Sequence, residues 1–166
     1  MKFITRGGAL LFLFSMCLTP AAYADSATGT AIATITRFLS ITNISDLEFG
    51  VVSVSSSAGS VMIDAQGNRR ASGGAAINPN DEFTPARFVI QGKPNATFTV
   101  SLPRRVELKD TSGNIIAVDN IQSSQGTGRL DGAGALEITI GGQVNFAPNQ
   151  STGDYSGVLV VELNYS

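Results

Sequence analysis

Few residues in this 166-residue chain have the types and spacing that chemistry requires. Histidine, the commonest general base and a frequent zinc ligand, is absent, and Cys17 is the only thiol. Asp81 and Glu82 form the only adjacent pair of carboxylates, the residue type used for general acid–base catalysis. They directly follow Asn78-Pro79-Asn80, a sequence typical of a turn. We therefore expect no catalytic residues and no enzyme activity.

One short stretch has the oxygen-ligand spacing of a calcium loop. Asp64-x-Gln66-x-Asn68 places three oxygen-bearing side chains at alternate positions, but no acidic residue closes the loop as a full calcium site requires. A hairpin turn explains this stretch better. Phosphate-binding and dinucleotide-binding glycine motifs are also absent from the sequence. We therefore expect no metal site and no cofactor.

The first 24 residues have the three parts of a secretory signal peptide. A basic start, Met1 to Arg6, precedes an apolar run from Ala9 to Leu18, and Ala22-Tyr23-Ala24 is a small-x-small cleavage site. The apolar run is too short to span a bilayer, which takes about 20 residues. We predict that residues 1–24 are removed and that the protein is secreted.

Cleavage after Ala24 changes both the cysteine count and the charge of the chain. The remaining 142 residues contain no cysteine, so an ordinary hydrophobic core must hold the protein together. They carry 9 basic and 13 acidic residues, a net charge of −4. This balance argues against nucleic acid and anionic membrane as partners, and no later apolar run is long enough for a membrane span.

Residues 25–37 form a distinct N-terminal extension of small and β-branched residues, which favour an extended strand over a helix. One face of such a strand would carry Thr30, Ile32, Thr34 and Thr36, and the other Ala31, Ala33 and Ile35. Three interpretations stay open: a flexible leader, a first strand of the domain itself, or a strand that fills a groove in another subunit.

Residues 38–166 show an all-β pattern. Short runs of alternating apolar and polar residues are separated by turns rich in Gly, Asn, Asp and Pro, as in Asp64–Asn68 and Asp110–Asn114. Residues 123–134 are rich in Ser and Gly and are expected to form an exposed loop. No stretch has convincing helical periodicity. These features predict one β-sandwich or barrel domain.

The last stretch of the sequence carries the strongest strand pattern. From Tyr155 to Tyr165 the odd positions are apolar apart from Gly157, while Glu162 and Asn164 lie between them. A long apolar strand with an unpaired edge promotes aggregation unless another segment covers it. We expect either an earlier part of this chain or another chain to do so.

This last stretch resembles the C-terminal motif of chaperone–usher pilus subunits. Gly153 lies fourteenth from the end, Tyr165 is penultimate, and the residues between them include Leu159, Val161 and Leu163. The body, around Asp46-Leu47-Glu48-Phe49-Gly50 and Tyr155-Ser156-Gly157, also resembles a bacterial secreted domain family of unknown function. The chain departs from many pilins because its predicted mature form lacks a disulfide.

The pilin resemblance implies an immunoglobulin-like β-sandwich that lacks its final strand and is completed by donor-strand complementation. A periplasmic chaperone, and then the arm of another pilin subunit at the outer-membrane usher, would fill the resulting groove. Gly153, Leu159, Val161, Leu163 and Tyr165 would belong to the acceptor groove and chaperone contact. Ile32 and Ile35 are the candidate donor residues, with Ile32 preferred as the plug.

The resemblance thus predicts a structural pilus subunit in adhesion or biofilm, secreted through the periplasm to the cell surface. The alternative is a monomeric secreted β-sandwich, a binding or matrix protein, in which residues 29–37 pair with the chain's own last strand.

Overall fold

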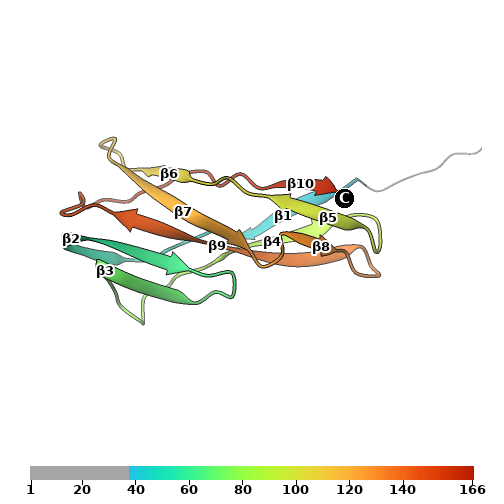
Figure 1. The fold of residues 1–166 in the computed structure, drawn as a ribbon, viewed down its shortest axis with the longest axis horizontal. Helices are drawn as coiled ribbons and strands as arrows, with labels where there is room; N and C mark the ends of the chain where they lie inside the picture. Colours follow the sequence, from blue (N-terminus) through green and yellow to red (C-terminus); the bar gives the residue numbers. More distant parts are fainter. Residues whose placement is uncertain (1–37) are drawn as a thin grey trace, which may run out of the picture. The chain divides into compact units, whose positions relative to one another are not determined.

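The computed structural model describes residues 38–166. The predicted signal peptide and the extension 25–37 lie outside the described residues. All the regular secondary structure within residues 38–166 is β-strand, as the alternating sequence predicts (Figure 1). All strand pairs in this region are antiparallel. The fold class is therefore all-β, with two antiparallel sheets.

The ten strands of this region lie in chain order as β1 (Ser40–Ser45), β2 (Val52–Ile63), β3 (Arg69–Ile77), β4 (Ala86–Gln91), β5 (Thr97–Ser101), β6 (Val106–Lys109), β7 (Ile115–Ser123), β8 (Thr127–Arg129), β9 (Ala135–Phe146) and β10 (Glu162–Tyr165).

The larger sheet is built around β9. One edge of β9 pairs with β4 and then with β2, and its other edge pairs with β7; β1, β3 and β6 continue the sheet outward (Figure 1). Gly141 lies where β4 gives way to β2, and a Cβ there would come within 2.1 Å of the Ile63 carbonyl oxygen. Glycine is thus required for the backbones to approach at this junction.

The smaller sheet has the order β10-β5-β8. Phe98 and Val100 on β5 point inward and are buried, as their alternation with Thr97, Thr99 and Ser101 predicts. They pack with Ile90, Ile138 and other residues of the larger sheet in a first core cluster. The two sheets therefore share this part of the core, an arrangement consistent with a β-sandwich.

Three strand connections use one turn design, Asp-x-x-Gly, in which the aspartate carboxylate accepts hydrogen bonds from the backbone N–H groups two and four residues later. The turns start at Asp64, Asp110 and Asp131 and join β2 to β3, β6 to β7 and β8 to β9. The fourth residue is a glycine with φ of +82°, +85° or +83°. A turn that ends in a left-handed glycine is common in three-residue hairpin loops. The first two connections are such hairpins, because β2 pairs with β3 and β6 pairs with β7, whereas the third leads from one sheet to the other. The two turns predicted from Asp64 and Asp110 are confirmed.

The expectation of an exposed loop over residues 123–134 is wrong in its centre. Thr127–Arg129 form β8, which pairs with β5, and Leu130 is only 1% exposed. The Ser- and Gly-rich composition hides a short strand because pairing with β5 and burial of one leucine outweigh weak local propensity.

Candidate functional site: an open apolar groove

The second core cluster is covered differently from the first. Its buried residues Val61, Ala75, Ile116, Val118 and Val144 all come from the larger sheet. The smaller sheet contributes none of them; β6 and the irregular segments around residues 47–49 and 155 pack there instead. This part of the inner face of the larger sheet is therefore covered without a strand of the smaller sheet.

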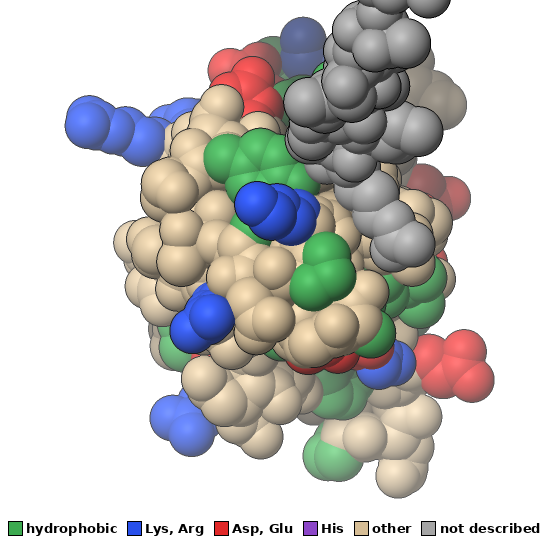
Figure 2. Space-filling model, turned by 90° about the vertical axis from the view of Figure 1, so that its right-hand side faces the viewer, with side chains coloured by type: hydrophobic (Ala, Val, Ile, Leu, Met, Phe, Trp, Pro, Cys, Tyr) green, Lys and Arg blue, Asp and Glu red, His purple; other side chains and the backbone are tan. Residues whose placement is uncertain are grey.

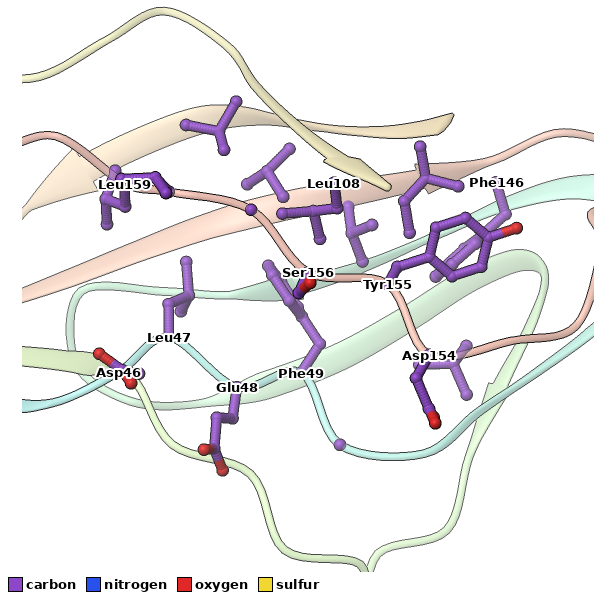
Figure 3. A pocket seen from close by; sticks show the side chains of 18 of the residues that line it. Asp46, Leu47, Glu48, Phe49, Leu108, Phe146, Asp154, Tyr155, Ser156 and Leu159 are labelled. Carbon is purple, nitrogen blue, oxygen red and sulfur yellow. The ribbon is translucent and has the colours of Figure 1, made fainter. Parts of the chain in front are cut away.

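A groove of about 850 Å³ opens over this second cluster (Figure 3). Its floor includes Ile116, Val118 and Val144, which are between 1% and 6% exposed, and its sides include Phe49 and Leu108. The polar lining residues belong to the segments 43–48 and 150–156, so the residues from β2, β4, β6, β7 and β9 that line the groove are all apolar. Such a surface favours an apolar occupant.

The first wall of the groove is the segment that leads from β1 to β2. Glu48 exchanges both backbone hydrogen bonds with Thr84, at 2.8 and 3.0 Å, so the backbone groups of Leu47 face the opposite edge. Figure 3 shows the side chains of Leu47 and Phe49 pointing toward the other wall, with Glu48 pointing away. The wall thus combines inward apolar side chains with an unpaired backbone edge at Leu47.

Arg69 and Gly50 fix the bend at the end of this wall. The Arg69 guanidinium donates hydrogen bonds to the carbonyl oxygens of Phe49, at 3.0 Å, and Asn78, at 2.6 Å, and lies over the Phe83 ring at 4.6 Å. Gly50 has a φ of +71°, and a Cβ there would meet the Glu82 carbonyl oxygen at 2.3 Å. The Arg69 hydrogen bond therefore ties Phe49 to β3, and Gly50 allows the chain to pass close to the Glu82 carbonyl.

The second wall is the segment 153–161 that leads into β10. Ser156 exchanges backbone hydrogen bonds of 2.8 and 3.0 Å with Lys109 at the end of β6. A Cβ on Gly157 would lie 2.4 Å from the Glu107 carbonyl oxygen, so this glycine allows the wall to approach β6. Within the described residues 38–166, residues 157–161 make no backbone–backbone hydrogen bond.

The two walls run in opposite directions. In Figure 3, Leu47 lies at the end of the groove where Leu159 lies, whereas Phe49 lies nearer Tyr155 and Asp154. Because each wall uses its outer side for backbone hydrogen bonds, the groove lies between two backbone edges that are unpaired within the described region at Leu47 and at residues 157–161.

The residues predicted for the acceptor groove occupy two different places. Gly153 and Leu159 line the groove. Val161 and Leu163 do not line it but pack against the first core cluster. The alternate residues Val158 and Val160 are exposed, with Val158 also bordering the groove, so the predicted alternation is present. The Tyr165 hydroxyl accepts a hydrogen bond from the Lys93 N–H at 3.2 Å, at the other end of this segment. Only residues 162–165 form a strand, a shorter stretch than the alternation predicts.

Sequence reasoning missed the floor and most of the first wall. Ile116, Val118 and Val144 look like ordinary strand residues, and their position under the groove depends on long-range pairing of β7 with β9. In the sequence, Phe49 and Gly50 belong to an alternating run and to a family motif, and neither indicates the wall of a groove. The candidate donor residues Ile32 and Ile35 lie outside the described residues.

Acidic groups border the groove. Asp46, Glu48 and Asp154 are among the residues that line it, and the lining residues include no Lys or Arg. Beside Gly153, hydrogen bonds led by the Asn114 side chain lower the pKa of Asp110 below its usual value. Elsewhere on the domain, Figure 2 shows Lys and Arg side chains standing separately on the face that it presents, with no continuous basic patch.

Among residues 38–166, no helix is long and apolar enough to cross a membrane.

The fold and the groove define this region as an all-β, two-sheet domain with an apolar groove between two oppositely directed segments. The chain belongs to the family described as a domain of unknown function (DUF4402), whose model matches residues 39–165. No curated protein and no solved structure matches the chain.

Proposed function

We propose that this protein is a structural subunit of a surface pilus, and that its groove accepts the N-terminal arm of another copy. The observation that carries the proposal is the groove itself, in which an apolar floor lies between two segments with unpaired backbone edges. A strand added there would form main-chain hydrogen bonds with both walls and cover the second core cluster. The domain would then be an immunoglobulin-like sandwich completed from outside.

The length and composition of the extension 25–37 support this occupant. Seven consecutive residues from Thr30 to Thr36 are small or β-branched and uncharged, which suits a strand with both edges paired. An arm that leaves one subunit and enters the next makes a head-to-tail contact that does not close, so repetition gives a fibre. A periplasmic chaperone would occupy the groove first and an outer-membrane usher would exchange it for the arm, with adhesion or biofilm as the role of the fibre.

Strand geometry disfavours the alternative in which the arm fills its own groove. The tightest hairpin, a two-residue turn at residues 38–39, pairs Arg37 with Ser40, and each step along β1 moves one step back along the arm. Thr30 then lies opposite Leu47, and Thr28 opposite Phe49. Both isoleucines of the arm would stay beside β1, outside the groove. A second copy has no such constraint and can place an isoleucine over the floor.

The test compares the mature chain with a variant that lacks residues 25–37. We expect the mature chain to give SDS-resistant ladders on unheated gels and fibres by electron microscopy. The shortened variant should be monomeric and of low stability until a peptide of residues 25–37 is added. A mature chain that stays a stable monomer at all concentrations would refute the proposal in favour of a monomeric binding or matrix protein.

A further inference from the structure

We propose that the arm enters the groove with Ala31, Ala33 and Ile35 facing the floor, so that Ile32 faces outward against Val158 and Val160. This inference rests on the proposed function and reverses the preference for Ile32 as the plug. It assigns different roles to the two isoleucines, one in covering the core and one in contacting the rim.

The floor decides which face of the arm is buried. The lining residues from β4, β6, β7 and β9 are Ala, Phe, Val, Leu and Ile, with no side chain that can accept or donate a hydrogen bond. The face with Ile32 also carries Thr30, Thr34 and Thr36, whose hydroxyls would have no side-chain partner there. A buried hydroxyl without a partner is costly, whereas Ala31, Ala33 and Ile35 bring no polar side-chain atom.

Exposed valines beside the groove explain why the opposite face of the arm also carries an isoleucine. Val158 is 79% exposed and Val160 is 55% exposed on the outer face of the second wall, and Val158 lines the groove. Val51, 68% exposed, follows the bend of the first wall. A strand inserted between these walls would place its outward side chains beside Val158, where an apolar, β-branched residue makes a favourable cross-strand pair.

Cysteine cross-linking tests both the orientation of the arm and the placement of Ile32 against the second wall. With Cys17→Ser the whole chain lacks cysteine, so each added pair is the only source of a disulfide. Side chains opposite each other on one face of a sheet have Cβ atoms about 4.5–5.5 Å apart, near the separation that a disulfide needs. We expect Val158→Cys to form intersubunit disulfides with Ile32→Cys or Thr34→Cys, and not with Ala33→Cys or Ile35→Cys.

Two adjacent lysine substitutions give a second measure. Ala33→Lys should lower the yield of SDS-resistant polymer roughly tenfold or more, because it places a charge on the apolar floor. Thr34→Lys, the matched control one residue away, should retain most of the polymer because its side chain reaches solvent.

The outcomes separate this inference from the proposed function. Disulfides at the odd arm positions, with Thr34→Lys as the blocking variant, would overturn the assigned orientation while leaving arm exchange in place. Ladders that form without a disulfide at any of the four positions would also overturn it. If the unsubstituted chain forms no ladder at all, the proposed function fails, and this inference fails with it.

Discussion

Replacement of Gly157 by alanine should destabilise the domain by pushing the second wall of the groove off β6. The new Cβ would lie 2.4 Å from the Glu107 carbonyl oxygen and 2.8 Å from Leu108 Cδ2. A backbone oxygen cannot turn aside as a flexible side chain can, so residues 156–158 must shift. The nearest interactions to be lost are the two backbone hydrogen bonds between Ser156 and Lys109.

The size of the effect follows from those two bonds. A typical hydrogen bond contributes about 0.5–1.5 kcal/mol net, so loss of both would lower the free energy of unfolding by about 1–3 kcal/mol. For a domain of this size that corresponds to a fall in Tm of roughly 4–12 °C. Thermal unfolding followed by circular dichroism measures it, provided that variant and parent have the same oligomeric state in size-exclusion chromatography.

Gly132→Ala is the matched control for this prediction. Gly132 lies in the β8–β9 turn with a φ outside the left-handed region, and a Cβ there would meet no atom within 4 Å. Alanine should therefore leave Tm unchanged or raise it slightly, because it restricts the unfolded chain. Equal Tm values for Gly157→Ala and Gly132→Ala would refute the claimed close approach of the wall to β6.

Three further predictions concern the groove and the turns. Leu163→Lys should abolish SDS-resistant polymer and reduce periplasmic yield, since it puts a charge among residues that pack on the first core cluster; fibres of normal yield would contradict this. Arg69→Ala should lower both Tm and polymer yield because it removes the hydrogen bond to the Phe49 carbonyl. The control substitution Arg70→Ala, at an exposed neighbouring residue, should change neither quantity. Hydrogen bonds, chiefly from the side chains of Asn68 and Asn114, lower the pKa of Asp64 and of Asp110 in the folded state. Stability from these carboxylates is therefore present above their unfolded pKa of about 3.9 and is lost as pH falls through the lower folded values. Urea midpoints measured from pH 5 down to pH 2 should fall less steeply in an Asp64→Asn, Asp110→Asn double variant, and identical pH profiles would exclude this contribution.

Local patterns in the sequence were enough to predict the strands that alternate and the turns that bond within themselves. Phe98 and Val100 are buried as their alternation predicts, and the turns at Asp64 and Asp110 form because the aspartate and the left-handed glycine lie within five residues. β8 was missed because its stability comes from β5, about thirty residues away in the sequence. The same holds for the floor of the groove, which exists only after β7, β9 and β2 have paired.

The C-terminal segment shows what local alternation predicts and what it does not predict. Alternation correctly predicted that Leu159, Val161 and Leu163 face the core. It did not reveal that only Leu159 of these three lines the groove, or that residues 157–161 make no strand pairing within the described region. Whether a segment finds a partner depends on what lies beside it, and local periodicity carries no information on that point.

The arrangement of the walls explains why collapse does not close the groove. On one side, Glu48 is bonded to Thr84 and the Phe49 carbonyl to Arg69; on the other, Ser156 is bonded to Lys109. Moving either wall inward would break these bonds and leave their donors and acceptors to find new partners. Within the described residues, the two inner edges make no backbone hydrogen bond to each other. The second core cluster can therefore gain cover at lowest cost from a third segment, which is the physical reason for proposing that another copy supplies one.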